Sequence, residues 1–205
     1  MTFAESKWVS LVDFAARGSA IRRGGTYGGD VDSDRGDGVS RGVISACVRR
    51  GQSDTFVFQY VLIAEMPGIR VPSALSPGRA DGLWKHTCFE AFLAIPGVPG
   101  YYELNFSPSQ QWAIYRFSGY RERMSPTDVT VPPELNVRRF DDRLELDAVV
   151  RLPELTVLET GRTLKLALTA VVEDNSGTLS YWALQHAPGK PDFHHPDGFV
   201  LELTP

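Results

Sequence analysis

The segment from Asp81 to Gly119 constrains the fold more than any other part of the chain. It reads DGLWKHTCFEAFLAIPGVPGYYELNFSPSQQWAIYRFSG, three strand-like runs separated by two turn-rich breaks. Polar residues stand at alternate positions of these otherwise apolar runs, and successive side chains of a strand point to opposite faces. The pattern predicts a sheet with one face in a core and the other face available to hold a ligand.

Further strand pairs lie on both sides of this segment. VISACVRR and TFVFQYVLIA are separated by a turn at 51–54, and LNVRRF and RLELDAVVRL by a turn at 141–142. TLKLALTAVVED and TLSYWALQ are separated by a turn at 175–177, and FVLEL is a final strand. Short strands, turn signals about every ten residues and almost no helical periodicity are typical of an antiparallel sandwich. We therefore predict an all-β antiparallel β-sandwich over residues 42–205.

Residues 1–41 differ in composition from the rest of the chain. Positions 18–42 are rich in Gly, Asp, Ser and Arg and offer too little apolar surface to offset their ordering entropy. The first 20 residues place four apolar side chains loosely at helical spacing, namely Trp8, Leu11, Val12 and Phe14. We expect residues 1–41 to be a flexible or poorly ordered N-terminal segment that contains a short amphipathic helix.

Charge, hydropathy and cysteine content exclude several classes of protein. The 205-residue chain has a formal net charge of -4 and no run of Lys and Arg, which argues against nucleic acid as a partner. No apolar segment approaches the ~18 residues of a membrane span, and the N-terminus does not resemble a signal peptide. We expect a cytoplasmic protein in which Cys47 and Cys88 are reduced packing residues, with no metal site of the zinc type.

Alternation sorts the central runs into two faces. If Phe89, Tyr102 and Ala113 and their alternate neighbours form the core, the opposite face collects a carboxylate, an amide, an indole and a guanidinium, those of Glu90, Asn105, Trp112 and Arg116. Such groups can pair with vicinal hydroxyls while an indole packs on a sugar ring. The alternative is an ordinary polar sheet face with a Glu90–Arg116 ion pair.

Three phrases of the sequence resemble a known family. DGLWKHTCFEAFL, YYELNFSPSQQWAIYRFSGYR and SYWALQHAPGKPDFHHPDGFVLEL look like the DOMON-like domain proteins, which are related to family 9 carbohydrate-binding modules. The similarity runs from about Val43 to the C-terminus. It implies a β-sandwich with a ligand site on or between its sheets.

The resemblance also implies site residues. Family 9 modules hold a sugar between two tryptophans, with a glutamate a few residues after the first, and Trp84, Glu90 and Trp182 match that element. Asn105, Gln111 and Arg116 stand where those modules place polar sugar contacts. The structural alternative is that Trp84 caps the core and Trp182 anchors it.

Together these features predict a non-catalytic domain that binds a saccharide or related polyhydroxylated compound without a cofactor. Some relatives are fused to a cell-wall precursor reductase, so a muropeptide-type sugar is a candidate ligand. Two alternatives are a protein-interaction module and a haem-binding electron-transfer domain, the latter because possible axial ligands are present: Met66, Met124, His86, His186, His194 and His195. A carboxylate pair of Glu90 with Asp81, Glu103 or Glu173 is the enzyme alternative, but no catalytic motif accompanies it.

Overall fold

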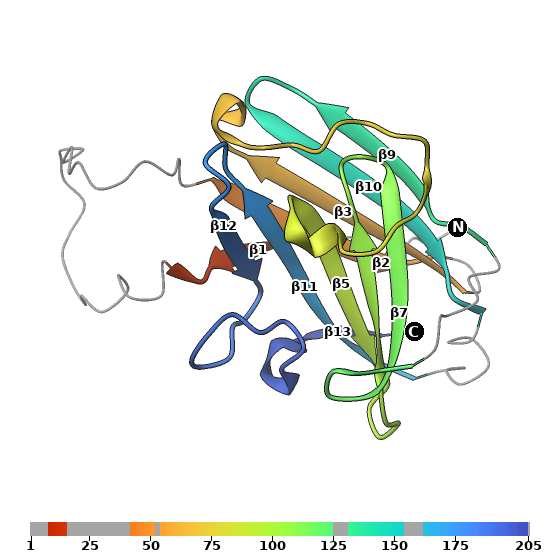
Figure 1. Cartoon of the computed structure of the whole chain (residues 1–205). Coiled ribbons are helices and arrows are strands. Elements are labelled where there is room, and N and C mark those ends of the chain that lie inside the picture. Colours follow the sequence, from red (N-terminus) through yellow and green to blue (C-terminus); the bar gives the residue numbers. More distant parts are fainter. Residues whose placement is uncertain (1–7, 16–41, 52–53, 125–130, 154–161, 205) are drawn as a thin grey trace.

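The computed structural model describes residues 8–15, 42–51, 54–124, 131–153 and 162–204, which form two β-layers (Figure 1). The first layer has the order β1 (Trp8–Asp13), β2 (Val43–Arg50), β3 (Thr55–Ile63), β10 (Arg143–Arg151), β9 (Glu134–Arg139). The second has the order β4 (Gly78–Arg79), β7 (Gln111–Gly119), β6 (Tyr101–Phe106), β5 (Cys88–Ala94), β11 (Leu164–Glu173), β12 (Leu179–Ala183). These layers confirm the predicted all-β antiparallel sandwich.

Two short strands and three single turns of 3-10 helix complete the described elements. β8 (Glu122–Arg123) pairs with β7, and β13 (Leu201–Leu203) pairs with β11. The turns are η2 (Met66–Gly68), η3 (Leu83–Lys85) and η4 (Pro196–Gly198). Among the described residues, no helix is long and apolar enough to cross a membrane. β4 pairs with β7 in parallel, whereas the other strand pairs of the described chain are antiparallel.

Strand β1 joins the two layers at one edge of the sandwich. Its first four residues pair with β2, and Val12 and Asp13 pair with β12 of the other layer. Leu11 is buried while the neighbouring Ser10 and Val12 are exposed, which is the period-two pattern of a strand. The predicted helix is therefore wrong over β1, and β1 belongs to the sandwich that was predicted to begin at 42. Residues 1–7 and 16–41 lie outside the described residues.

The core lies between the layers. Phe89 of the second layer stacks on Tyr60 of the first at 5.0 Å between ring centroids, and Phe106 meets Phe58 at 5.6 Å. All four rings are almost fully buried. Burial of a large apolar side chain contributes about 1.5–3 kcal/mol, so these cross-layer pairs fix how the sheets stack. Both cysteines are buried and free, as predicted.

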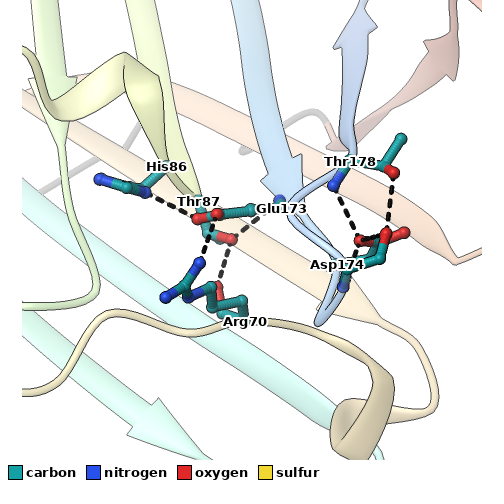
Figure 2. Close-up of polar contacts among 7 residues, drawn as sticks. Arg70, His86, Thr87, Glu173, Asp174 and Thr178 are labelled. Atoms are coloured by element: carbon teal, nitrogen blue, oxygen red, sulfur yellow. Dashed lines mark hydrogen bonds and ion pairs between the residues drawn. The ribbon is translucent and has the colours of Figure 1, made fainter.

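A long connection between β3 and β5 crosses the end of β11 and carries η2, β4 and η3. The carboxylate of Glu173, at the end of β11, ties this connection down (Figure 2). It accepts from Arg70 Nη1 at 3.0 Å and lies 2.7 Å from His86 Nδ1. The hydroxyl of Thr87 donates to the Arg70 carbonyl at 2.7 Å and accepts from the Glu173 amide at 3.1 Å. The connection is thereby held in place just after η2, at Arg70, and just after η3, at His86 and Thr87.

Candidate ligand-binding site

Strand register defines which side chains share the outer face of the second layer, the face that points away from the core. Glu90 lies opposite Asn105 of β6 and Thr169 of β11, and Asn105 lies opposite Ala113 of β7. Residues opposite each other in a sheet point to the same face. The predicted grouping of Glu90 with Asn105 therefore matches the register.

The face predicted for β7 is wrong. Trp112 lies opposite Phe106, and Arg116 lies opposite Tyr102, so both belong to the inner side of the layer. Trp112 is buried in the core, and the Arg116 guanidinium lies 5.8 Å from the centre of the Tyr102 ring. Glu90 and Arg116 therefore face opposite sides of the sheet and do not form the alternative ion pair either.

A cavity of about 550 Å³ opens on this outer face. Glu90, Glu103 and Val171 lie on its floor, together with Tyr115 and Phe117 of β7 and Tyr181 of β12. Three segments outside the main strands form the walls: η3 with Trp84 and Lys85, the β7–β8 hairpin with Arg121 and Arg123, and the β12–β13 loop with Pro191, Phe193 and His194. Such a mostly apolar hollow with a few converging polar groups is the usual form of a small-molecule site.

Glu90 is the most unusual group on the floor. Its side chain is almost completely buried, and Oε1 has no hydrogen-bond partner among the described residues. Burial, and then the neighbouring Glu103, raise the pKa of Glu90 well above its usual range, because a carboxylate loses its hydration there and meets a like charge. Thr169 Oγ1, on the adjoining strand, is also buried without a partner among these residues. Of the two residues, Glu90 lines the cavity and offers an unsatisfied oxygen to a ligand, whereas Thr169 does not line it.

Glu103 is held by its neighbours. Its Oε1 accepts a hydrogen bond from Asn105 Nδ2 at 2.7 Å, and Oε2 lies 3.7 Å from His194 Nε2. Burial raises the pKa of Glu103, and the Asn105 hydrogen bond opposes part of that shift. Burial and then Arg121 lower the pKa of His194 to about 4, so the imidazole is neutral at pH 7. His194 Nδ1 lies 2.8 Å from the Tyr101 hydroxyl, which fixes the ring.

His195 follows His194 in the β12–β13 loop and makes a hydrogen bond within it. Its Nδ1 accepts from the Asp197 amide at 3.2 Å, and the His194 amide donates to Asp192 Oδ1 at 3.1 Å. These hydrogen bonds hold the backbone of the loop in place. Among the described residues, no group of three or more His, Cys, Asp and Glu side chains could hold a metal ion.

Two arginines at the rim are each paired with an aspartate. Arg121 Nη2 donates to Asp192 at 2.7 Å, and Tyr120 donates to the same carboxylate. Arg123 lies over the Tyr115 ring at 3.8 Å and reaches Asp81 at 3.3 Å. The positive charge of each rim arginine is therefore compensated mainly by its own aspartate and only partly by the acids on the floor.

Asp81 is ionised at the rim for an identifiable reason. Tyr115 donates a 2.6 Å hydrogen bond to it, and this bond, followed by that from Arg79, lowers the pKa of Asp81. The hydrogen bond to Asp81 and the two arginines over the ring thus hold Tyr115 in place on the cavity floor. This ring then supports the neighbouring Trp84.

Trp84 projects into the cavity from η3. The turn follows Gly82, whose positive φ of 76° suits glycine, and Leu83 is buried beneath it. The Trp84 indole remains 37% exposed and meets Tyr115 edge-on at 5.8 Å. Because His86 and Thr87 are tied to Glu173, the position of Trp84 depends on the contacts of Figure 2.

The other predicted site residues lie elsewhere. Trp182 lies opposite Ala170 on the inner side of β12, is 8% exposed and belongs to the core, as the structural alternative proposed. Its neighbour Tyr181 faces the cavity instead and meets Phe193 at 6.1 Å. Gln111 lines a second hollow of about 390 Å³ and accepts from Ser109 at 3.3 Å. Asn105 is fully buried and orients Glu103.

Sequence reasoning missed most of the cavity walls. Tyr181 could have been found from the parity of β12, had a core residue on that strand been known. Phe193, Arg121 and Arg123 lie in loops or at a hairpin end, where side-chain direction has no fixed period.

No protein-family model matches the sequence, and no curated protein matches it either. A solved structure from Bacteroides uniformis, classed provisionally as a carbohydrate-binding protein, is similar in fold. The two are 15% identical over 80% of this chain and 78% of that one, with a TM-score of 0.59. At this level of identity the likeness extends to the fold.

Two structures of a family 9 carbohydrate-binding module from Caldicellulosiruptor kristjanssonii are more distantly similar. The complex with cellotriose is 11% identical, covering 82% of this chain and 76% of that one, with a TM-score of 0.48. The complex with glucose is 10% identical, covering 87% and 92%, with a TM-score of 0.49. The DOMON-like assignment stays a prediction.

Proposed function

We propose that this domain binds a saccharide or a related polyhydroxylated compound, without catalysis, in the cavity on the outer face of the second layer. The observation that carries the proposal is the pairing of a buried, unsatisfied Glu90 on the floor with an exposed Trp84 indole on the wall of the same cavity. Carboxyl oxygens accept hydrogen bonds from hydroxyl groups, and an indole packs on the C–H face of a sugar ring.

The site proposed from the structure differs from the pair of tryptophans expected from the resemblance. Tyr181 and Phe193 supply aromatic surface in place of Trp182, and Glu103 supplies a second carboxyl group in place of Arg116. The fold likeness to the Bacteroides uniformis protein, classed provisionally as carbohydrate-binding, agrees with the proposal.

The test is isothermal titration calorimetry against a panel of mono- and oligosaccharides with wild type, Trp84→Ala and Trp8→Ala. Trp8 is a matched control because it is 48% exposed on β1 and does not line the cavity. We expect at least one saccharide to bind, with about fivefold or more weaker affinity in Trp84→Ala, since an aromatic stacking contact contributes on the order of 1 kcal/mol or more. Unchanged affinity in Trp84→Ala, or equal losses in both variants, would contradict the proposed site.

Two further measurements, haem addition and an assay for hydrolysis products, separate the alternatives. A Soret band on haem addition, with no saccharide bound, would favour the electron-transfer alternative. Product release from the oligosaccharides that is abolished by Glu90→Gln would favour the enzyme alternative.

A further inference from the structure

The floor of the cavity carries two buried carboxyl groups, those of Glu90 and Glu103, that have no Arg or Lys ion-pair partner among the described residues. Among the described residues, Glu90 has no ion-pair partner, and the base beside Glu103 is His194, whose pKa of about 4 leaves it neutral at pH 7. Both carboxyl groups are almost completely buried. An ionised carboxylate is costly in such a place, and the pKa of each acid is raised accordingly. A cation placed beside them would lower these pKa values and stabilise the ionised form.

The cations around the cavity do not remove this imbalance. Arg121 and Arg123 act on Glu103 from the rim, but each is bonded to an aspartate of its own, Asp192 or Asp81. The side chain of Lys85 lies against Gly82, with Nζ 3.8 Å from the position that a Cβ on Gly82 would take. The inner part of the cavity therefore holds carboxyl groups without a paired cation, while the two arginines at its open end are paired with aspartates.

Buried oxygens lie on three adjoining strands at the cavity floor, where Glu90 and Glu103 line the cavity and Thr169 lies beside Glu90 without lining it. Glu90 Oε1 and Thr169 Oγ1 are unpartnered among the described residues and come from adjoining strands, and Glu103 lies on the next strand in the other direction, two residues from the Asn105 that faces Glu90. An alkylammonium group has three N–H donors and one positive charge, so it can satisfy several of these oxygens at once. A neutral hydroxyl would donate one hydrogen bond and supply no positive charge to stabilise the ionised carboxylates.

The aromatic side chains that line the cavity suit the same ligand. Trp84, Tyr115 and Tyr181 present aromatic surface to the cavity. Aromatic faces attract ammonium groups as well as the C–H face of a sugar ring.

We propose that the natural ligand is an amino sugar, a saccharide with a free protonated amine that is seated on the cavity floor between Glu90 and Glu103. The inference rests on the proposed saccharide-binding function and specifies its ligand class. Glu90 would accept from the ammonium through its free oxygen, and Trp84 would pack on the ring above it.

The experiment compares three amino sugars that differ only in where the amine is attached: 2-amino-2-deoxyglucose, 3-amino-3-deoxyglucose and 6-amino-6-deoxyglucose. Each is titrated at pH 7 beside its N-acetyl derivative and glucose, which have no positive charge. Hydrogen bonds to charged groups contribute enough to expect at least one amine to bind about tenfold to a hundredfold more tightly than its acetylated form. Cyclohexylamine and putrescine serve as amines without a sugar ring.

The variants assign that preference to the floor. In Glu90→Gln and in Glu103→Gln the affinity ratio of amine to N-acetyl sugar should fall toward one. Glu202→Gln, an exposed acid on β13 outside the cavity, should retain the wild-type ratio. Circular dichroism confirms that each variant is folded, so a lost ratio is not a lost fold.

Neutral sugars that bind as tightly as the amines would overturn the inference and leave saccharide binding intact. An amine preference that persists in Glu90→Gln and Glu103→Gln would also overturn it. Equal affinity for cyclohexylamine or putrescine would show that the ring is not recognised. If no saccharide of either kind binds, the proposed function itself fails.

Discussion

The two tryptophans suggested by the sequence should behave in opposite ways when each is replaced by alanine. Trp182 is 8% exposed, lies in the core and donates from Nε1 to Ser180 Oγ at 3.0 Å. Trp84 is 37% exposed and meets Tyr115 edge-on. Trp182→Ala should therefore change stability, and Trp84→Ala should change binding.

The magnitudes follow from these environments. Removal of a buried Trp costs about 3–5 kcal/mol in free energy of unfolding, which in a domain of this size lowers Tm by roughly 6–20 °C. Loss of one aromatic pair costs about 0.5–1.5 kcal/mol, so Trp84→Ala should lower Tm by only a few degrees. Saccharide affinity should fall about fivefold or more in Trp84→Ala and stay within about threefold in folded Trp182→Ala.

Urea denaturation followed by far-UV circular dichroism gives the stabilities, and calorimetry well below each variant's Tm gives the affinities. A Trp182→Ala protein with wild-type stability would refute the assignment of Trp182 to the core. A stably folded Trp182→Ala protein that has lost ligand binding would instead restore the clamp of two tryptophans.

Three further predictions concern buried polar groups. Because the folded-state pKa of Glu90 is raised above its unfolded value near 4.5, the free energy of unfolding should fall as pH rises from about 4.5 through the raised pKa. Urea denaturations across pH should show a flatter slope for Glu90→Gln than for wild type. Parallel slopes would contradict this. Glu173→Gln should weaken saccharide binding several-fold in calorimetry, because it loosens the contacts that position Trp84, and an unchanged Kd would show that η3 is held without them. Cys88 is buried, and burial and then Glu90 raise the pKa of its thiol, so a thiol reagent should label Cys88 only in urea. Buried Cys47 should behave in the same way. Rapid labelling of the native protein would refute this burial.

The sequence predicted the architecture well because alternation and turn signals are local. The hairpins around 51–54, 141–142 and 175–177 form as expected, with β2 on β3, β9 on β10 and β11 on β12. β1 was missed because six residues that mix apolar and polar side chains fit either period, and pairing with β2 and β12 decides the conformation.

The site was predicted only in part because face assignment needs an anchor. In β5 one alternate set contains Glu90 and the other is wholly apolar, so the polar set was recognised. In β7 both sets are largely aromatic or aliphatic, and a shift of one residue exchanges the faces of a whole strand. Contact with β6 resolves the ambiguity and places Tyr115 rather than Trp112 in the cavity. Walls formed by loops leave no periodic signal.

The indole N–H resonances of the chain's four tryptophans offer the most direct test of the proposed site. A ¹⁵N–¹H NMR titration with a saccharide follows Trp8, Trp84, Trp112 and Trp182 separately in one experiment. We expect the Trp84 indole to shift with saturation while the exposed Trp8 and the core residues Trp112 and Trp182 hold their positions. A saturable shift confined to Trp8 or Trp182, with Trp84 unmoved, would contradict binding in this cavity.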